Sequence, residues 1–286
     1  EPACDDPALP ANLKPKAFGA CADCHAPGMS GVPGGRDLHE AEGLAFNSGV
    51  FCDTCHKVRD IDPSKPPGIG PNQRLILQRP SEASSGMLPF KPLFFGPLVD
   101  VGNSFMGASF QPKFKQAEFC SGCHLQQQPA LLAGQQLAAR FKDGLPVHDT
   151  FKEWQDGPYA KAGVPCQHCH MPSHFDLVST ADDATKENQS ITFGFSRPPS
   201  DKRAHTFRGP LYDDGVQPRL IDGAVFTSVD LTLNGAALAA NVSINNGGCG
   251  HAIPTGEPMR ALLLVVSAEG KGCGTLAATS GMTVID

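Results

Sequence analysis

Cysteine and histidine recur in this sequence at one fixed spacing, Cys-x-x-Cys-His, in four places. The first cysteines are Cys21, Cys52, Cys120 and Cys166, and the second cysteines are Cys24, Cys55, Cys123 and Cys169. A histidine follows each pair: His25, His56, His124 and His170. This spacing is the attachment signature of c-type haem, because the two thiols add to the two vinyl groups on one edge of the macrocycle and the adjoining imidazole reaches the iron as proximal ligand. The sequence therefore predicts four haem c groups as cofactors.

Two other uses of such a motif are a zinc half-site and a redox dithiol. A zinc site does not require a histidine directly after the second cysteine, and a thioredoxin-like dithiol needs one motif in a βαβ context. Four copies with histidine in the same place favour haem. Covalent haem also explains how a chain with 31 Gly and 26 Pro among 286 residues folds, because each macrocycle supplies apolar surface that such a chain lacks. Haem attachment and folding are then coupled.

Six histidines lie outside the proximal positions, enough to give each of four irons a second imidazole. A second imidazole closes the iron and suits electron transfer, whereas an open position suits chemistry on a small molecule. The candidate distal ligands are His39, His148, His205 and His251, with His174 in reserve and His168 disfavoured because it lies inside a motif. For each one the alternative is a solvated surface histidine, and the six methionines leave His/Met ligation open.

Several segments resemble multihaem cytochromes of the group that includes cytochrome c nitrite reductases and hydroxylamine oxidoreductases. They are residues 49–57, 118–124, 150–172 and the loop 250–256 with Arg260. The resemblance covers most of residues 17–265 and implies that His205 and His251 are distal ligands. Many nitrite reductases of that group hold one open haem through a lysine, and no motif here ends in lysine, so the resemblance favours an electron carrier. Some small tetrahaem relatives polymerise into extracellular filaments, which adds self-association by analogy alone.

Charge and hydropathy exclude some partners and favour a compartment. The net charge of −6 gives no basic field for phosphates, which argues against nucleic acid. No apolar run approaches the ~18 residues that cross a bilayer, so we expect no membrane span, and the longest run, 261–266, is typical of a buried strand. Haem attachment and the spare cysteines indicate a periplasmic or extracellular protein of a bacterium or archaeon. We expect a mature terminus at Glu1, and the strand-like end at Asp286 suggests that the chain continues.

The expected fold is a mostly irregular, haem-organised chain with a few short helices, plus a small C-terminal β-sandwich. Residues 1–220 form the predicted tetrahaem domain and residues 221–286 the β-sandwich-like domain. Strands are expected over 224–233, 237–244 and 259–267, and helices over 131–141 and from Thr150 onward. The His251 loop is expected to reach the haem region or a neighbouring subunit. Cys249 and Cys273 are either a disulfide or two free thiols, and Cys4 is left over.

These features predict electron transfer through four bis-His haems and no catalytic residues. The expected partners are other redox proteins and further copies of the chain, in an extracellular conductive filament on the analogy above. A second hypothesis is a periplasmic reductase of a small nitrogen or sulfur oxyanion at one open haem. A third is a structural protein whose β-domain mainly builds a polymer.

Overall fold

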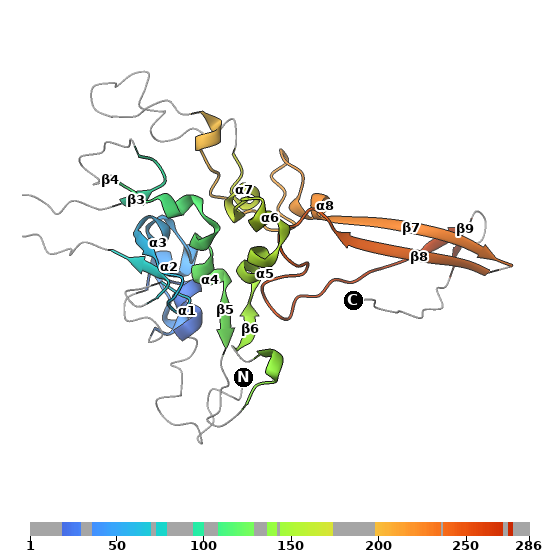
Figure 1. Cartoon of the computed structure of the whole chain (residues 1–286), viewed down its shortest axis with the longest axis horizontal. Helices are drawn as coiled ribbons and strands as arrows, with labels where there is room; N and C mark the ends of the chain where they lie inside the picture. The colour runs from blue at the N-terminus through green and yellow to red at the C-terminus, as the bar shows by residue number, and fades with distance from the viewer. Residues whose placement is uncertain are drawn as a thin grey trace, which may run out of the picture.

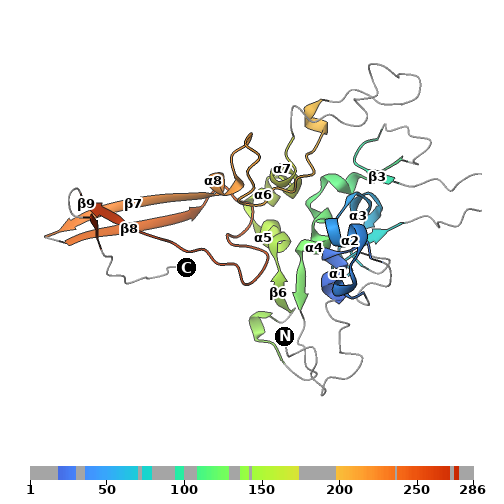
Figure 2. The same cartoon turned by 180° about the vertical axis from the view of Figure 1, so that it is seen from behind.

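The computed structural model describes residues 19–29, 36–69, 73–78, 94–99, 108–128, 136–141, 144–173, 198–235, 237–270 and 274–276. Within these ranges the helices and most strands are short, and much of the chain runs in turns and bends. Figures 1 and 2 show a body that holds helices α1 to α7 and a long arm, the hairpin of β7 and β8, that projects from it.

The α-helices are one to two turns long. Those that carry the Cys-x-x-Cys-His motifs are α1 (Gly19–His25), α3 (Cys52–His56), α4 (Ser121–His124) and α7 (Cys166–His170). The others are α2 (Gly43–Ser48), α5 (Thr150–Asp156), α6 (Pro158–Lys161) and α8 (Leu220–Ala224). Single 3-10 turns are η1 (Leu38–Glu40), η2 (Pro112–Lys115), η3 (Ala117–Phe119), η4 (Ala139–Phe141) and η6 (Pro199–Asp201).

The strands form two-stranded ladders. The antiparallel ladders pair β1 (Val58–Ile61) with β2 (Leu75–Leu77), β5 (Gln126–Gln128) with β6 (Leu145–His148), β7 (Val225–Asn234) with β8 (Ala237–Asn246), and β9 (Ala268–Gly270) with β10 (Gly274–Leu276). A parallel ladder pairs β3 (Phe94–Gly96) with β4 (Ala108–Phe110). Two strands alone are marginally stable in water, so the short ladders depend on packing against the rest of the body.

A small apolar cluster lies where β1 and β2 meet α4. Its buried members are Val58, Ile61, Ile69 and Leu75, and Leu77, Phe119 and Cys123 pack against them. Cys123 belongs to the motif on α4, whereas β1 follows the motif on α3 directly. The cluster therefore holds the second and third motifs at a fixed separation.

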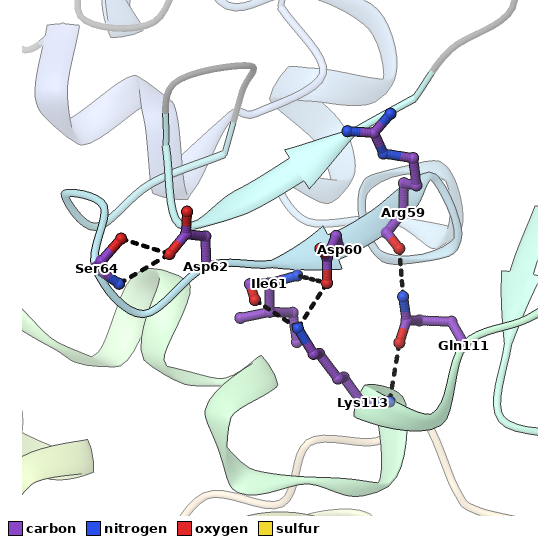
Figure 3. A network of polar contacts seen from close by, with 7 residues as sticks. All are labelled: Arg59, Asp60, Ile61, Asp62, Ser64, Gln111 and Lys113. Atoms are coloured by element: carbon purple, nitrogen blue, oxygen red, sulfur yellow. Dashed lines mark hydrogen bonds and ion pairs between the residues drawn. The ribbon is translucent and has the colours of Figure 1, made fainter.

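A network of polar side chains links β1 to the turn η2, next to this cluster (Figure 3). Lys113 Nζ donates to Asp60 Oδ1 at 2.6 Å and to the carbonyl oxygen of Ile61 at 2.7 Å. The Gln111 amide donates to the carbonyl oxygen of Arg59 and accepts from the Lys113 backbone N–H at 3.0 Å. Because these partners are about fifty residues apart in sequence, the network ties β1 to the turn η2 that precedes α4.

The arm is a regular hairpin, paired from Val225 with Asn246 to Asn234 with Ala237. Its strands confirm those expected over 224–233 and 237–244. The prediction of a buried strand over 261–266 is wrong, since the large side chains from Leu262 to Val266 are 42–83% exposed and the segment has no strand pairing. No described segment packs over it. A second sheet stacked on the hairpin is not among the described residues, so the β-sandwich stays a prediction.

Helix predictions have mixed outcomes. The helix expected from Thr150 is confirmed by α5, which follows Asp149. Of the helix expected over 131–141, the described part 136–141 contains only the 3-10 turn η4, so a continuous helix there is wrong. Within the described part of the chain, no helix has the length and apolar character to cross a membrane.

Candidate cofactor-binding site

The four motifs fold as short helices, which places their reactive groups together. Residues i, i+3 and i+4 share one face of an α-helix. In Cys-x-x-Cys-His these are the two cysteines and the histidine, so both thiols and the imidazole of each motif leave the helix on the same side. Each motif has at least one buried residue between its cysteines: Asp23, Thr54, Ser121 and Gln167. On α1, α4 and α7, polar contacts of this part of the motif hold the helix in place.

On α1 the anchor is an ion pair. Asp23 Oδ1 accepts from Arg36 Nη2 at 2.5 Å, and both side chains are buried. The same guanidinium donates to the carbonyl oxygens of Pro27 at 3.0 Å and Met29 at 3.3 Å. Arg36 thereby fixes the turn that follows the first motif.

On α4 the anchor is close backbone packing. The Gly68 N–H donates to the carbonyl oxygen of Gly122 at 2.6 Å, and Arg74 Nη1 donates to that of Ser121 at 2.9 Å. A methyl group at Gly122 would overlap the Leu75 side chain. A glycine between the two cysteines is thus required by the core beside it.

On α7 the anchor is an amide. Gln167 Nε2 donates to the carbonyl oxygens of Phe114 at 3.0 Å and Gln116 at 2.7 Å. These acceptors lie just before the third motif, so Gln167 links α7 to the segment that precedes α4.

The motif thiols gather around α4. The Cys24 thiol hydrogen-bonds that of Cys123, which lowers the pKa of Cys24 and raises the pKa of Cys123. The Cys120 thiol does the same with Cys166, which raises the pKa of Cys120 and lowers that of Cys166. Burial, followed by the charge of its motif partner, raises the pKa of Cys55 to about 11. The third motif therefore contacts the first and the fourth.

Two motif histidines lie near a candidate distal histidine at the same ring separation. The ring centroids of His56 and His205 are 6.1 Å apart, and so are those of His170 and His251. A metal ion held between two imidazole nitrogens at bonds of about 2.0–2.1 Å, with about 1.1 Å from nitrogen to centroid, needs ring centroids about 6.3 Å apart. Both centroid separations therefore match the spacing of two imidazoles that share one metal ion.

Backbone carbonyls orient both motif imidazoles. His56 Nδ1 lies 2.8 Å from the carbonyl oxygen of Phe95, and His170 Nδ1 lies 2.6 Å from that of Arg208. A carbonyl oxygen only accepts, so Nδ1 carries the proton in each ring and Nε2 keeps a lone pair. A histidine that binds a metal through Nε2 needs this tautomer. A carbonyl oxygen that accepts the Nδ1 proton also makes Nε2 a more basic ligand.

The third motif histidine lies near His148. Desolvation by the surrounding protein, followed by the charge of His148, lowers the pKa of His124. His148 ends β6, where it pairs with Gln126 of β5, two residues after His124. The ladder of β5 and β6 therefore brings the third pair of predicted ligands together.

The loop that carries His251 is docked on α5. Glu153 Oε2 accepts from the Thr255 hydroxyl at 2.5 Å and from the Ala252 N–H at 3.1 Å. The Tyr159 hydroxyl donates to the carbonyl oxygen of Gly248 at 3.3 Å. The loop therefore packs on the part of the same chain that carries the third and fourth motifs, and whether it reaches a haem or a neighbouring subunit stays a prediction.

In the first motif, His25 and His39 are exposed, as His124 and His205 also are. Among the described residues, no ring contact joins His25 to His39. His39 instead lies 3.3 Å from an oxygen of Asp37. His168 is exposed, as a histidine on the outer side of its motif would be. His174 lies outside the described residues.

Cys249 is a free thiol 3.3 Å from Nδ1 of His251, whereas Cys273, its predicted disulfide partner, and Cys4 lie outside the described residues. Sequence reasoning also missed Glu153, Arg208 and the carbonyl oxygen of Phe95. A carbonyl acceptor leaves no mark in a sequence. Glu153 offered only a weak signal, as an acidic residue on the helix before the fourth motif.

No protein-family model matches this chain. No curated protein and no solved structure matches it either. Within the described residues, no three His, Cys, Asp or Glu side chains gather closely enough to hold a metal ion by themselves. The arguments that follow therefore rest on the residues of this chain.

Proposed function

We propose that this chain is a c-type cytochrome that carries four covalent haems and transfers electrons through bis-His irons. The observation that supports the proposal is the pair of equal ring separations: His56 lies 6.1 Å from His205 and His170 lies 6.1 Å from His251, between ring centroids. In both pairs one histidine belongs to a Cys-x-x-Cys-His motif whose thiols share its helix face. Thiols and paired imidazoles in this arrangement fit a haem.

In this proposal Cys21, Cys24, Cys52, Cys55, Cys120, Cys123, Cys166 and Cys169 form the thioethers, and His25, His56, His124 and His170 are proximal ligands. His205, His251, His148 and His39 are the distal ligands of the second, fourth, third and first motifs. The bound haem supplies one-electron chemistry.

The chain's own residues prepare each iron for electron transfer without chemistry on a substrate. The carbonyl oxygens of Phe95 and Arg208 fix the orientation of His56 and His170 and raise their basicity, which favours the oxidised iron and lowers the potential. With two histidines as ligands, each iron would have no position for an exogenous ligand. Gln167 ties α7 to the segment before α4, and the apolar cluster ties β1, which follows the second motif, to Cys123 of the third, so these three sites would be held at fixed separations.

The resemblance to the nitrite reductase and hydroxylamine oxidoreductase group supports the same function. It also supports a periplasmic or extracellular location with other redox proteins as partners.

A haem count with spectroscopy tests the proposal. The purified protein should bind four haems per chain in a pyridine haemochrome assay. His205→Ala and His251→Ala should each convert one iron from low-spin to high-spin and make it bind carbon monoxide. His168→Ala, a change at an exposed histidine, is the control and should leave every iron unchanged. Fewer than four haems, or low-spin irons in both distal variants, would contradict the proposal.

The second candidate function is a reductase of a small nitrogen or sulfur oxyanion at the first motif. It is favoured by the first motif because no described histidine lies near His25 at the ring separation found for His56 with His205 and for His170 with His251. A high-spin ferric signal in the unmodified protein, with turnover of nitrite, hydroxylamine or sulfite, would support it. A fully low-spin protein that turns over none of them would leave electron transfer as the function.

Self-association is a further part of the proposal, supported by the arm. Apolar side chains are exposed along it: Phe226, Val229, Leu231, Leu233, Leu238 and Ile244. The strand pairing places Val229, Leu231, Leu233, Leu238 and Ile244 on one face of the hairpin. An exposed apolar face of this kind usually marks an interface. Negative-stain microscopy should show unbranched fibres if copies assemble through it, and monodisperse monomers at micromolar concentration would argue against it.

A further inference from the structure

The residue two positions after His205 has a backbone conformation that normally belongs to glycine. Phe207 has a φ of 45°. Among the described residues, every other position with φ in the left-handed range is a glycine, as at Gly215 and Gly256. A residue with a Cβ atom is disfavoured in this conformation, whereas glycine adopts it readily. The presence of phenylalanine here therefore needs a reason other than backbone preference.

Hydrogen bonds on both sides of Phe207 explain the backbone conformation itself. The Ala204 N–H donates to the carbonyl oxygen of Pro172 at 3.0 Å. The Arg208 N–H donates to the carbonyl oxygen of His170 at 3.0 Å, and the Arg208 carbonyl oxygen lies 2.6 Å from His170 Nδ1. Because both ends of this short segment are fixed to α7 or to the residues directly after it, the three residues between them must turn tightly.

Burial does not explain the aromatic ring. Phe207 is 55% exposed, whereas Ala204 and Arg208, at the two fixed ends, are 7% and 4% exposed. The ring contacts the imidazole of His205, with the centroids 6.4 Å apart and the planes at 84°. Aromatic rings favour this edge-to-face arrangement. The side chain of Phe207 therefore packs against a proposed distal ligand and not in the core.

His205 is exposed, so the core does not fix the rotamer of its side chain. Its ring lies 6.1 Å from that of His56 on α3 and shares a hydrogen bond with the backbone of Arg203. A single hydrogen bond leaves the plane of the ring free to tilt, and ordering an exposed side chain costs conformational entropy. A contact that already restricts the imidazole therefore favours the orientation in which it faces His56.

We propose that Phe207 is a positioning residue whose ring holds the His205 imidazole toward the second motif, an inference that rests on the proposed function. Phe207 does not itself reach the ligand position and acts through His205. An edge-to-face pair of this kind changes the equilibrium between the held and the released imidazole about 2- to 10-fold.

The test measures carbon monoxide binding to the reduced four-haem protein that carries Phe207→Asn. Asparagine tolerates the left-handed conformation better than other residues with a Cβ atom, so the variant loses the ring and keeps the turn. The apparent affinity scales with the fraction of protein in which the distal imidazole has left. One iron should therefore bind carbon monoxide about 2- to 10-fold more tightly than in the wild type.

A spectroscopic readout accompanies the affinity. The ferric electron paramagnetic resonance signal of a bis-His haem depends on the angle between the two imidazole planes, which is 35° for His56 and His205. Loss of the Phe207 ring should change the signal of one haem and leave the other three as they are. A purely structural role of Phe207 would lower the melting temperature without moving this signal.

Three further variants separate the ring from the backbone. Phe207→Gly also removes the ring in a residue that accepts the turn, so it should match Phe207→Asn, and it decides alone if the asparagine variant does not accumulate. Phe207→Tyr keeps the ring and should restore the wild-type affinity and signal. Phe226→Ala removes a ring of equal exposure, 56%, from the arm and should leave every iron unchanged.

The outcomes distinguish this inference from the proposed function. Wild-type affinity and an unchanged signal in Phe207→Asn and Phe207→Gly, with four haems bound, would overturn the inference and leave the proposed function standing. A rise in Phe207→Gly without one in Phe207→Asn would assign the effect to backbone freedom and would also overturn the inference. A wild-type protein without haem would overturn both.

Discussion

Replacing Glu153 with alanine should loosen the loop that carries His251 and open the iron of the fourth motif. Glu153 Oε2 accepts from the Thr255 hydroxyl at 2.5 Å and from the Ala252 N–H at 3.1 Å. Hydrogen bonds to a charged group contribute about 1.5–3 kcal/mol each when buried. Because Ala252 is exposed and Glu153 only half-buried, we take about 2 kcal/mol for the two together, a factor of roughly 30 in the docking equilibrium.

Carbon monoxide binding to the reduced protein measures this equilibrium. A six-coordinate iron binds carbon monoxide only when its distal imidazole has left, so the apparent affinity scales with the undocked fraction. Glu153→Ala should raise the affinity of one iron roughly 30-fold over the wild-type value. The other irons should not change, because their distal histidines lie on other segments.

Two variants check the reasoning. Thr255→Val removes one of the two donors and should give a smaller rise in affinity. Lys152→Ala changes the same helix but removes only an exposed pair with Asp156, 2.7 Å away, so it should match the wild type. If Glu153→Ala binds carbon monoxide no better than Lys152→Ala while both are folded, the two hydrogen bonds do not hold His251 in place.

Two further predictions concern stability. Gly122→Ala would place a methyl group against the Leu75 side chain, and this overpacking should lower the free energy of unfolding by about 1–3 kcal/mol. Gly223→Ala, with open space around the new methyl group, should not lower it. Equal melting temperatures of the two variants would disprove the packing argument. The Lys113 hydrogen bond lowers the pKa of Asp60 from its ordinary 3.8, so the ion pair stabilises the fold above about pH 4 and is lost as pH falls through the lowered pKa. Because both side chains are partly exposed, that contribution is about 0.2–1 kcal/mol, and Asp60→Asn should remove it from a melting series over pH 2–6.

The residues that could attach a haem could be predicted from the sequence, because they lie within five consecutive positions of each motif. The repeated Cys-x-x-Cys-His pattern placed two thiols and an imidazole together before any helix was known. Alternation and turn residues indicated β7 and β8, and a capping position indicated α5. The failures were also local: the apolar run 261–266 is exposed rather than buried. A run of apolar residues indicates burial only when another segment is available to cover it.

Ligand pairing could not be predicted, because it depends on contacts between distant segments. His205 lies opposite His56 across 149 residues of chain, and no pattern near either residue records that partnership. The Phe95 and Arg208 carbonyl oxygens that orient the motif imidazoles are backbone atoms. His39 was a reasonable candidate from its position between two motifs, yet no ring contact brings it to His25 among the described residues.

The position of α4 leads to a last prediction, about the route of electrons. Its two cysteines contact different motifs, Cys123 the thiol of Cys24 on α1 and Cys120 the thiol of Cys166 on α7. A haem on α4 would then lie between those on α1 and α7, and electrons passing between the ends would cross it.

Replacing Cys120 and Cys123 with alanine removes this attachment point and should leave three haems. Stopped-flow reduction by a small soluble protein donor should then change from one phase to two, because the haems on either side no longer exchange electrons quickly. Replacing Cys52 and Cys55 instead also leaves three haems, but should keep the single phase if α3 lies to the side of the route. Should both three-haem proteins be reduced in one phase at the wild-type rate, the contacts around α4 do not define the path.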